Sequence, residues 1–225
     1  MVVRRRNVAT LPAAKRLYLI TPRLQPASLL ADDLVQAFNA ADVAAVLMRL
    51  TKADDAILIE QIRRVAPIVQ EHGVALLLDG RPDLVVACNA DGAHLTGAEA
   101  LRAALAILKP STAQSNLIAG VGGLTSRHDA MVAGEAGSDY LMFGEPDDGG
   151  LRPSPLAILE RVRWWTELFE VPAVAYAAAL DEIDSLSHTA VEFVAVDDAI
   201  WNDARGIEVA IRDATDRLKN PEPVR

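Results

Sequence analysis

The sequence predicts an α/β fold, a single (β/α)8 TIM barrel, from three observations. A short apolar run, a turn and a longer segment with helical periodicity recur eight times, and eight such units close a barrel. The 225 residues, 51% of them hydrophobic, suffice for one sizeable core and leave no room for a second domain. No Gly-x-Gly-x-x-Gly motif follows the first apolar run, where a dinucleotide-binding sheet would carry it. A closed barrel is therefore favoured, and an open doubly wound sheet is the alternative topology.

Each predicted strand is a short apolar run that ends in a turn. Most runs lack polar alternation, which is typical of parallel strands covered on both faces. Helical periodicity separates the runs, most clearly over residues 53–72, 126–137 and 156–169. In chain order the predicted strands are 16–21 (RLYLIT), 43–50 (VAAVLMRL), 74–79 (VALLLD), 92–96 (GAHLT), 116–122 (NLIAGVG), 139–144 (DYLMFG), 173–177 (AVAYA) and 193–200 (FVAVDDAI).

Composition indicates one cytoplasmic domain over residues 1–225 with a flexible N-terminal tail, residues 1–14. The net charge of −9 disfavours nucleic acid and anionic membranes as partners. No apolar stretch approaches the roughly 20 residues that span a bilayer. The basic run at residues 4–6 precedes no uninterrupted apolar region, so we predict no signal peptide. The single Cys88 excludes an intrachain disulfide, which fits a reducing compartment.

Several short motifs carry a family resemblance. Residues 17–21 (LYLIT), 79–84 (DGRPDL) and 90–95 (ADGAHL) stand in an order and at a spacing that resemble the thiamine phosphate synthase and thiazole tautomerase family, of which the chain looks like a divergent member. Residues 118–121 (IAGV) and 138–144 (SDYLMFG) fall where that family has its fifth and sixth strands. The resemblance implies a transferase of thiamine biosynthesis. Such an enzyme condenses hydroxymethylpyrimidine pyrophosphate with thiazole phosphate and releases pyrophosphate with the help of Mg²⁺.

The resemblance implies cations that hold the leaving pyrophosphate. The family's second strand ends in a Gln-x-Arg-x-Lys pattern, of which this chain keeps Arg49, with Lys52 one residue away from the lysine position. The loop after the sixth strand supplies Thr and Lys side chains in the family, and Arg152 is the candidate replacement here. Three carboxylates surround Arg152 in sequence, and like charge is unfavourable beside a pyrophosphate. They are Glu145, Asp147 and Asp148.

The resemblance also implies a Mg²⁺ site. The family has Asn-Asp-Arg after its third strand, and the register set by Arg81 places Asp79 at the asparagine and Gly80 at the metal-binding aspartate. Glu99 stands near the second ligand position, so Asp79 and Glu99 are the candidate metal ligands. The alternative is that Asp79 starts a turn and that Glu99 lies in the first turn of a helix, where carboxylates are favoured.

The resemblance implies, thirdly, a site for the thiazole phosphate. A Gly-Gly pair of the family corresponds to the segment from Tyr176 to Ala179, and Asp197 and Asp198 stand near its small residue and serine. Two carboxylates repel a phosphate, so we expect an acidic barrel mouth that takes a cationic or hydrogen-bonding ligand. Asp203 and its neighbours are expected to cap the terminal helix.

The tautomerase activity has weaker support from the residues. Its histidine follows the fifth strand, where this chain has Leu124 or Thr125, and the nearby His128 is expected to face solvent on a helix. His94 is a candidate for the pocket mouth, with a structural histidine bonded to the backbone as the alternative. The glycine-rich run 120–123 is a weak signal for phosphate.

Three hypotheses follow. The first hypothesis is an active synthase with a rebuilt site made of Arg49, Arg81, Arg152, Asp79 and Glu99. The second is a catalytically inactive family member that binds a metabolite or regulates. The third hypothesis is a different enzyme that uses an acidic mouth made of Asp79, Glu99, Asp197 and Asp198. In each case we expect a small-molecule ligand at the C-terminal barrel face, and a homodimer through the helix that carries Trp164 and Trp165 stays open. The ligand-binding candidates are Arg49, Arg81, His94, Arg152, Tyr176, Asp197 and Asp198.

Overall fold

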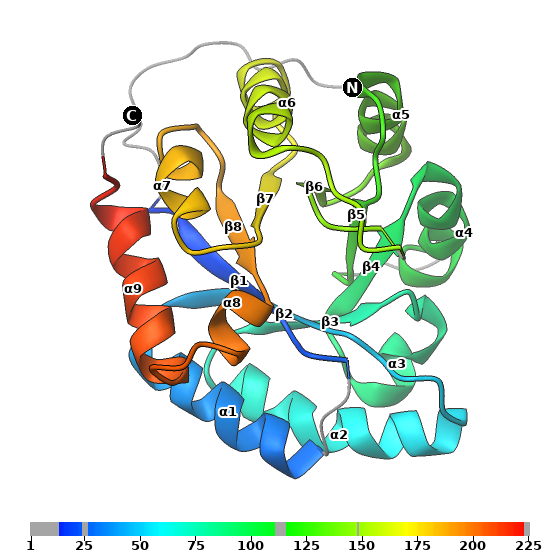
Figure 1. Cartoon of the computed structure of the whole chain (residues 1–225). Coiled ribbons are helices and arrows are strands. Elements are labelled where there is room, and N and C mark those ends of the chain that lie inside the picture. The colour runs from blue at the N-terminus through cyan, green and yellow to red at the C-terminus, as the bar shows by residue number, and fades with distance from the viewer. Residues whose placement is uncertain (1–13, 24–26, 111–115, 148, 223–225) are drawn as a thin grey trace.

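Eight parallel strands close into a barrel in chain order, β1 to β8 (Figure 1). This computed structural model describes residues 14–23, 27–110, 116–147 and 149–222. The pairing of β1 with β8, which sets Arg16 opposite Phe193, closes the sheet and rules out the open alternative. The strands are β1 (Arg16–Ile20), β2 (Val43–Met48), β3 (Ala75–Asp79), β4 (Gly92–Thr96), β5 (Ile118–Gly122), β6 (Tyr140–Phe143), β7 (Ala173–Ala177) and β8 (Phe193–Val196).

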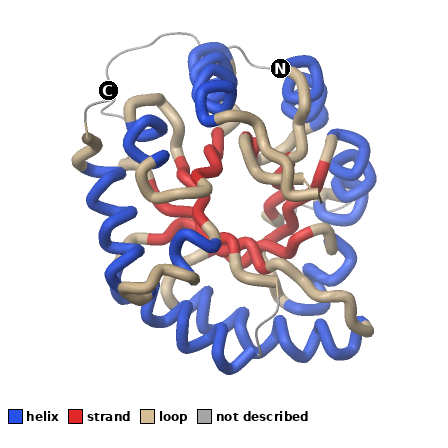
Figure 2. Tube along the Cα trace, in the orientation of Figure 1, coloured by secondary structure: helices blue, strands red, loops and turns tan. Residues whose placement is uncertain are grey.

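The helices form a ring outside the strands, as expected when right-handed crossovers link neighbouring parallel strands (Figure 2). Helix α5 begins at a capping box, in which Ser126 and Asp129 each bind the backbone of the other. The helices are α1 (Ala27–Ala40), α2 (Asp55–Glu71), α3 (Val85–Cys88), α4 (Ala98–Leu108), α5 (Arg127–Ala136), α6 (Pro155–Leu168), α7 (Glu182–Ser187), α8 (Asp198–Trp201) and α9 (Ile207–Lys219), and a 3-10 turn η1 (Pro82–Leu84) precedes α3.

Two predictions near the C-terminus are wrong. The eighth strand ends at Val196, and the last part of the segment predicted as strand becomes α8 instead. The indole of Trp201 in α8 donates a 2.7 Å hydrogen bond to the carbonyl of Ile20, which fixes this short helix beside the end of β1. Asp203 does not cap α9, whose N-cap is Gly206, because its carboxylate accepts bonds from the backbone and side chain of Arg205.

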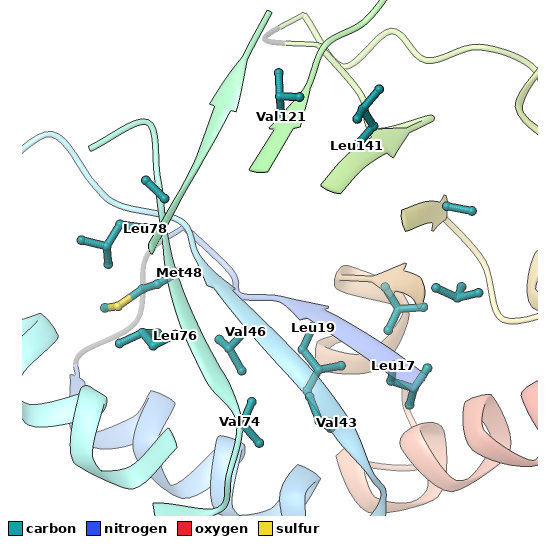
Figure 3. Close-up of a cluster of buried hydrophobic side chains, with 14 of the residues drawn as sticks. Leu17, Leu19, Val43, Val46, Met48, Val74, Leu76, Leu78, Val121 and Leu141 are labelled. Carbon is teal, nitrogen blue, oxygen red and sulfur yellow. The ribbon is translucent and has the colours of Figure 1, made fainter. Parts of the chain in front are cut away.

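The strands bury both of their faces in two apolar layers, which explains why their sequences lack polar alternation. One layer lies between the sheet and the helices; it includes Leu17 and Leu19 of β1, and Figure 3 shows such outward side chains. The other fills the barrel interior and includes Tyr18 and Ile20, the alternate residues of the same strand. Trp165 on α6 is fully buried in the outer layer, so its predicted packing against the barrel is confirmed.

The predicted tail includes residues 1–13, which lie outside the described residues, as does Asp148 in the loop after β6. In the ranges that the structure describes, every helix is too short or too polar to cross a bilayer. Cys88 is buried with a free thiol at the end of α3.

Candidate functional site

A cavity of about 700 Å³ opens at the C-terminal ends of the strands. Ile20, Leu47, Asp79 and His94 reach it from the ends of β1 to β4, and the loops after β5 and β6 complete its wall. Parallel strands deliver side chains to one end of a barrel, which is where such folds bind ligands. This is the face at which the sequence placed the ligand.

The cavity wall is mixed in charge rather than uniformly acidic. Three carboxylates line it, those of Asp79, Glu145 and Asp147. Positive charge comes from the end of β1, the end of β2, the loop after β6 and helix α6. The arginines that line the cavity are Arg23, Arg49, Arg152 and Arg161.

Arg49 and Asp197 form an ion pair across the mouth. The guanidinium Nη2 of Arg49 lies 2.9 Å from Oδ2 of Asp197, and both side chains are largely buried. The backbone N–H of Arg49 donates to the hydroxyl of Thr21, which fixes the end of β2 against that of β1. The pair neutralises Asp197, whereas Asp198 is exposed at the first position of α8. The two neighbouring carboxylates thus differ in role.

Arg152 is held by a carboxylate that the sequence did not suggest. Its two terminal nitrogens donate to both oxygens of Glu182 on α7, at 2.9 and 2.8 Å. The same carboxylate accepts the backbone N–H of Ala178 at 3.0 Å, directly after β7. The guanidinium also lies over the ring of Tyr176, 5.3 Å from its centroid. Burial and the charge of Asp197 raise the pKa of Tyr176, so the ring carries a neutral hydroxyl.

Three buried polar side chains form a hydrogen-bonded chain inside the barrel. The hydroxyls of Tyr18 and Tyr140 lie 2.7 Å apart, and Nδ1 of His94 lies 2.8 Å from the Tyr140 hydroxyl. The hydrogen-bond partner of His94 is therefore a side chain, whereas the structural alternative expected a bond to the backbone. Burial lowers the pKa of His94 to about 4, so the imidazole is neutral at physiological pH.

Glu145 follows β6 and turns into the cavity. Its Oε1 accepts the backbone N–H of Gly123 at 2.5 Å. Burial, and to a smaller extent the charge of Asp79, raise the pKa of Glu145 to about 7, against the lowering effect of backbone donors and of Arg161. Arg161 in turn donates to the carbonyls of Leu124 and Thr125, which holds the loop after β5 in place.

Of the remaining candidates, only Asp79 lines this cavity. Arg81, the residue before η1, binds Asp55 and Asp83 at 2.8 and 2.6 Å. Glu99 is exposed in the first turn of α4, while Asp79 lines the cavity. Lys52 is exposed after β2, and His128 is exposed on α5, as predicted.

The residues that sequence reasoning missed are Tyr18, Tyr140, Glu145 in its inward role, and Glu182. The two tyrosines lie within continuous apolar runs, and nothing in such a run distinguishes a tyrosine whose hydroxyl forms a hydrogen bond from an ordinary core residue. Glu145 directly follows the strand end, and this position was the available signal. Its acidic neighbours suggested instead a group that opposes Arg152. Glu182 belongs to a helix that starts after β7, and nothing in the sequence links it to Arg152.

His94 and Glu145 give opposite contributions to the pH dependence of stability. Since the fold lowers the pKa of His94 from 6.5, its contribution is present above pH 6.5 and is lost as pH falls toward 4. Since the fold raises the pKa of Glu145 from 4.5, its contribution is present below pH 4.5 and is lost as pH rises toward 7. Between pH 4.5 and 6.5, where both groups titrate, the two effects on the free energy of unfolding have opposite signs and offset each other.

Replacing Glu145 alone should make its contribution to the pH dependence of stability measurable. We expect Glu145→Gln to gain roughly 2 kcal/mol in free energy of unfolding relative to the parent as pH rises through the window of Glu145, at ~1.4 kcal/mol per pKa unit with a reduction for partial exposure. Urea denaturation of both proteins at the two ends of that window measures the difference. The control is Glu160→Gln on the exposed face of α6. Its difference from the parent in free energy of unfolding should change by less than about 0.5 kcal/mol over the same pH range. A pH-independent difference for Glu145→Gln would contradict the assignment.

The chain is similar in sequence to known thiamine-phosphate synthases. A family model described as thiamine monophosphate synthase matches residues 17–200. The chain is 36% identical to the thiamine-phosphate synthase of Rhodospirillum centenum over 201 residues, which covers 88% of this chain and 95% of that protein. It is 32% identical to the thiamine-phosphate synthase of Hyphomonas neptunium over 208 residues, with 88% and 90% covered.

Solved structures show the same architecture. A thiamine phosphate pyrophosphorylase from Pyrococcus furiosus matches with a TM-score of 0.75 at 24% identity, covering 93% of this chain and 98% of that one. A 3-hexulose-6-phosphate synthase from Salmonella typhimurium matches with a TM-score of 0.65 at 13% identity, covering 92% and 100%. At these identities the likeness demonstrates the fold alone.

Proposed function

Because the chain belongs to the thiamine monophosphate synthase family, we propose that it joins hydroxymethylpyrimidine pyrophosphate to thiazole phosphate and releases pyrophosphate. The observation that carries the proposal is the presence of two oriented arginines, Arg49 and Arg152, in one cavity at the C-terminal strand ends. Guanidinium groups bind phosphate oxygens with two parallel hydrogen bonds and stabilise the negative charge that develops on a leaving pyrophosphate.

Asp197 and Glu182 would act as positioning residues in this reaction. A long arginine side chain loses rotamer freedom when it binds a phosphate, and a carboxylate that already holds the guanidinium reduces that cost. Arg49 donates to Asp197 with one terminal nitrogen, and within the described ranges its other guanidinium N–H groups show no hydrogen bond, so they can donate to a ligand. Arg152 uses both terminal nitrogens on Glu182, so it would contribute mainly charge unless the pair rearranges.

The reaction of the family implies Mg²⁺, and one carboxylate fits such a role. Asp79 lines the cavity at the end of β3, close enough to Glu145 for its charge to raise the pKa of that group. The described residues contain no cluster of three or more metal-binding side chains. Mg²⁺ commonly binds through one or two carboxylates together with substrate phosphates, so Asp79 would hold it only when the pyrophosphate is present. Bound there, the ion would neutralise charge on the leaving group.

One observation favours a second candidate, a family member that binds a metabolite without the condensation. Barrels often bind a phosphate at the backbone N–H groups that follow strands seven and eight. Here the carboxylate of Glu182 accepts the N–H of Ala178, so an anionic side chain occupies this donor. A thiazole phosphate would have to displace that carboxylate or bind elsewhere, whereas an uncharged second ligand would not.

Complementation separates the two candidates. The parent gene is expected to restore growth without thiamine to a strain that lacks its synthase, and the purified protein to form thiamine phosphate in a Mg²⁺-dependent assay. Arg152→Met should lower kcat/KM by about 10²-fold or more, because it removes a charge that faces the leaving group. The matched control is Arg163→Met on the exposed face of α6. A folded parent protein that forms no thiamine phosphate would overturn the synthase and leave the metabolite-binding candidate.

A further inference from the structure

A second cavity, of about 220 Å³, lies between α6 and α7, the two helices that flank β7 (Figure 1). Its rim carries Pro155 and Asp181, both of them exposed. Glu182 and Ser185 line it from α7. The rest of the lining is buried and mostly apolar, and it consists of Ile158, Leu159, Tyr176 and Leu186. The proposed condensation gives this cavity no role.

One ion pair separates this cavity from the larger one. Glu182 lines the second cavity, and Arg152, which donates to both of its oxygens, lines the first. Tyr176 also lines the second cavity, and its ring lies against the guanidinium of Arg152. A ligand that binds Glu182 from one side therefore affects the guanidinium on the other side.

The ion pair leaves one polar atom of Arg152 unsatisfied. Its Nε is buried and has no hydrogen-bond partner among the described residues. A buried donor without an acceptor is unfavourable, so a second arrangement of the guanidinium is accessible. An anion in the larger cavity that accepted from Nε and one terminal nitrogen would satisfy this donor. The guanidinium would then release one oxygen of Glu182.

The polar side of the second cavity offers three hydrogen-bond acceptors. The carboxylate of Asp181 makes no capping bond to α7 and, within the described ranges, no ion pair. Ser185 lies four residues later on the same side of the helix, and its hydroxyl has no hydrogen bond to the described residues. The third acceptor is Glu182. Because Arg152 compensates only one of the two carboxylates, the cavity keeps one negative charge.

We propose that the cavity between α6 and α7 binds a small primary ammonium ion with a short aliphatic body. An ammonium group has three donors and no acceptor, which matches two carboxylates and one hydroxyl. The buried isoleucine and leucine side chains contact the aliphatic part. At roughly 30 Å³ for each water the cavity holds about seven waters, which is room enough for a ligand of the size of n-butylammonium.

The ammonium ion competes with Arg152 for Glu182. When Glu182 turns toward the new cation, the guanidinium of Arg152 gains donors for an anion in the larger cavity. Coupling between two binding sites is reciprocal, so the ammonium ion and the anion each tighten the binding of the other. The inference rests on the proposed function, which supplies pyrophosphate as that anion.

Binding measurements with two probes test the site. By NMR, the parent should bind n-butylammonium at least about tenfold more tightly than n-butanol, which has the same body without the charge. At constant ionic strength, n-butylammonium should tighten pyrophosphate binding about fivefold in calorimetry. Asp181→Asn should lose both effects, and its exposed position makes misfolding no explanation. Glu167→Gln on the exposed face of α6 is the control and should behave like the parent.

The Nε–Hε NMR signal of Arg152 gives a measurement that does not need pyrophosphate. It should shift when n-butylammonium is added to the parent, and it should stay in place in Asp181→Asn. Equal affinity for the two probes, an Arg152 signal that does not respond, or a pyrophosphate affinity that n-butylammonium leaves unchanged would each overturn the inference. A parent that shows the coupling but makes no thiamine phosphate would overturn the proposed condensation alone.

Discussion

Gly120→Ala is expected to destabilise the protein by about 3 kcal/mol or more, which places it beyond the usual range for a single added methyl group. A Cβ at Gly120 would lie 2.0 Å from Cζ and 2.3 Å from the hydroxyl oxygen of Tyr140. Tyr140 cannot move away cheaply, because it is 6% exposed and hydrogen-bonded to both Tyr18 and His94. Since about 2–4 °C of melting temperature corresponds to 1 kcal/mol in a chain of this size, thermal unfolding should show a drop of roughly 10 °C.

The cause of that drop can be isolated. If the clash with the tyrosine ring is responsible, Gly120→Ala should cost far less when Tyr140 is already valine, and the double-mutant cycle should show strong coupling. Gly149→Ala is the control, because the nearest atom to a Cβ there is Oδ1 of Asp147, at 3.2 Å, well beyond the distances at Gly120. Its melting temperature should stay close to that of the parent. An unchanged melting temperature for Gly120→Ala would mean that the ring has free space that the structure does not show.

The glycine-rich run after β5 has a packing role in the structure. The sequence suggested a weak phosphate loop, since glycines expose backbone donors. In the structure Gly120 makes room for Tyr140, and Gly122 makes room for Glu145. The donor at Gly123 binds the carboxylate of Glu145. The glycines thus allow two inward side chains to enter the site, which a sequence cannot reveal without the positions of β5 and β6 relative to each other.

The barrel could be predicted because burial on both faces leaves continuous apolar runs at regular intervals. The error at the end of β8 has the same origin. Ala199 and Ile200 are apolar and follow the run after two aspartates, and the four residues of α8 are too few to distinguish strand from helical periodicity. Of the candidate residues at strand ends, Arg49 and Asp79 line the cavity.

The partners of those residues could not be predicted from sequence. Arg49 and Asp197 are 148 positions apart, and only closure of the barrel brings β2 and β8 to opposite sides of β1. The sequence therefore made Asp197 part of an acidic mouth, although its charge is compensated. Arg152 was judged by its neighbours in the loop, whereas its ion-pair partner lies on α7. Charge in a folded site depends on pairing in space, which local composition does not report.

Arg49→Met is the second substitution with a large expected effect. It leaves Asp197, which is 5% exposed, as a buried carboxylate without its cation. Removing one partner of a buried ion pair lowers the free energy of unfolding by about 3–5 kcal/mol, because the remaining charge keeps its desolvation penalty. Urea denaturation should therefore show a fall of about 3 kcal/mol in the free energy of unfolding, together with loss of pyrophosphate binding by calorimetry.

The exposed pair of Arg64 and Glu60 provides a matched control for the same substitution. Its atoms lie 2.5 Å apart, but both side chains are more than 60% exposed, so Arg64→Met should cost less than about 1 kcal/mol. The double variant Arg49→Met, Asp197→Leu removes both charges and should recover much of the stability while pyrophosphate binding stays lost. That separation would assign the pair to ligand binding and not to stability. If Arg49→Met were as mild as Arg64→Met, solvent would have to screen Asp197, and the oriented guanidinium on which the proposed leaving-group site depends would not exist.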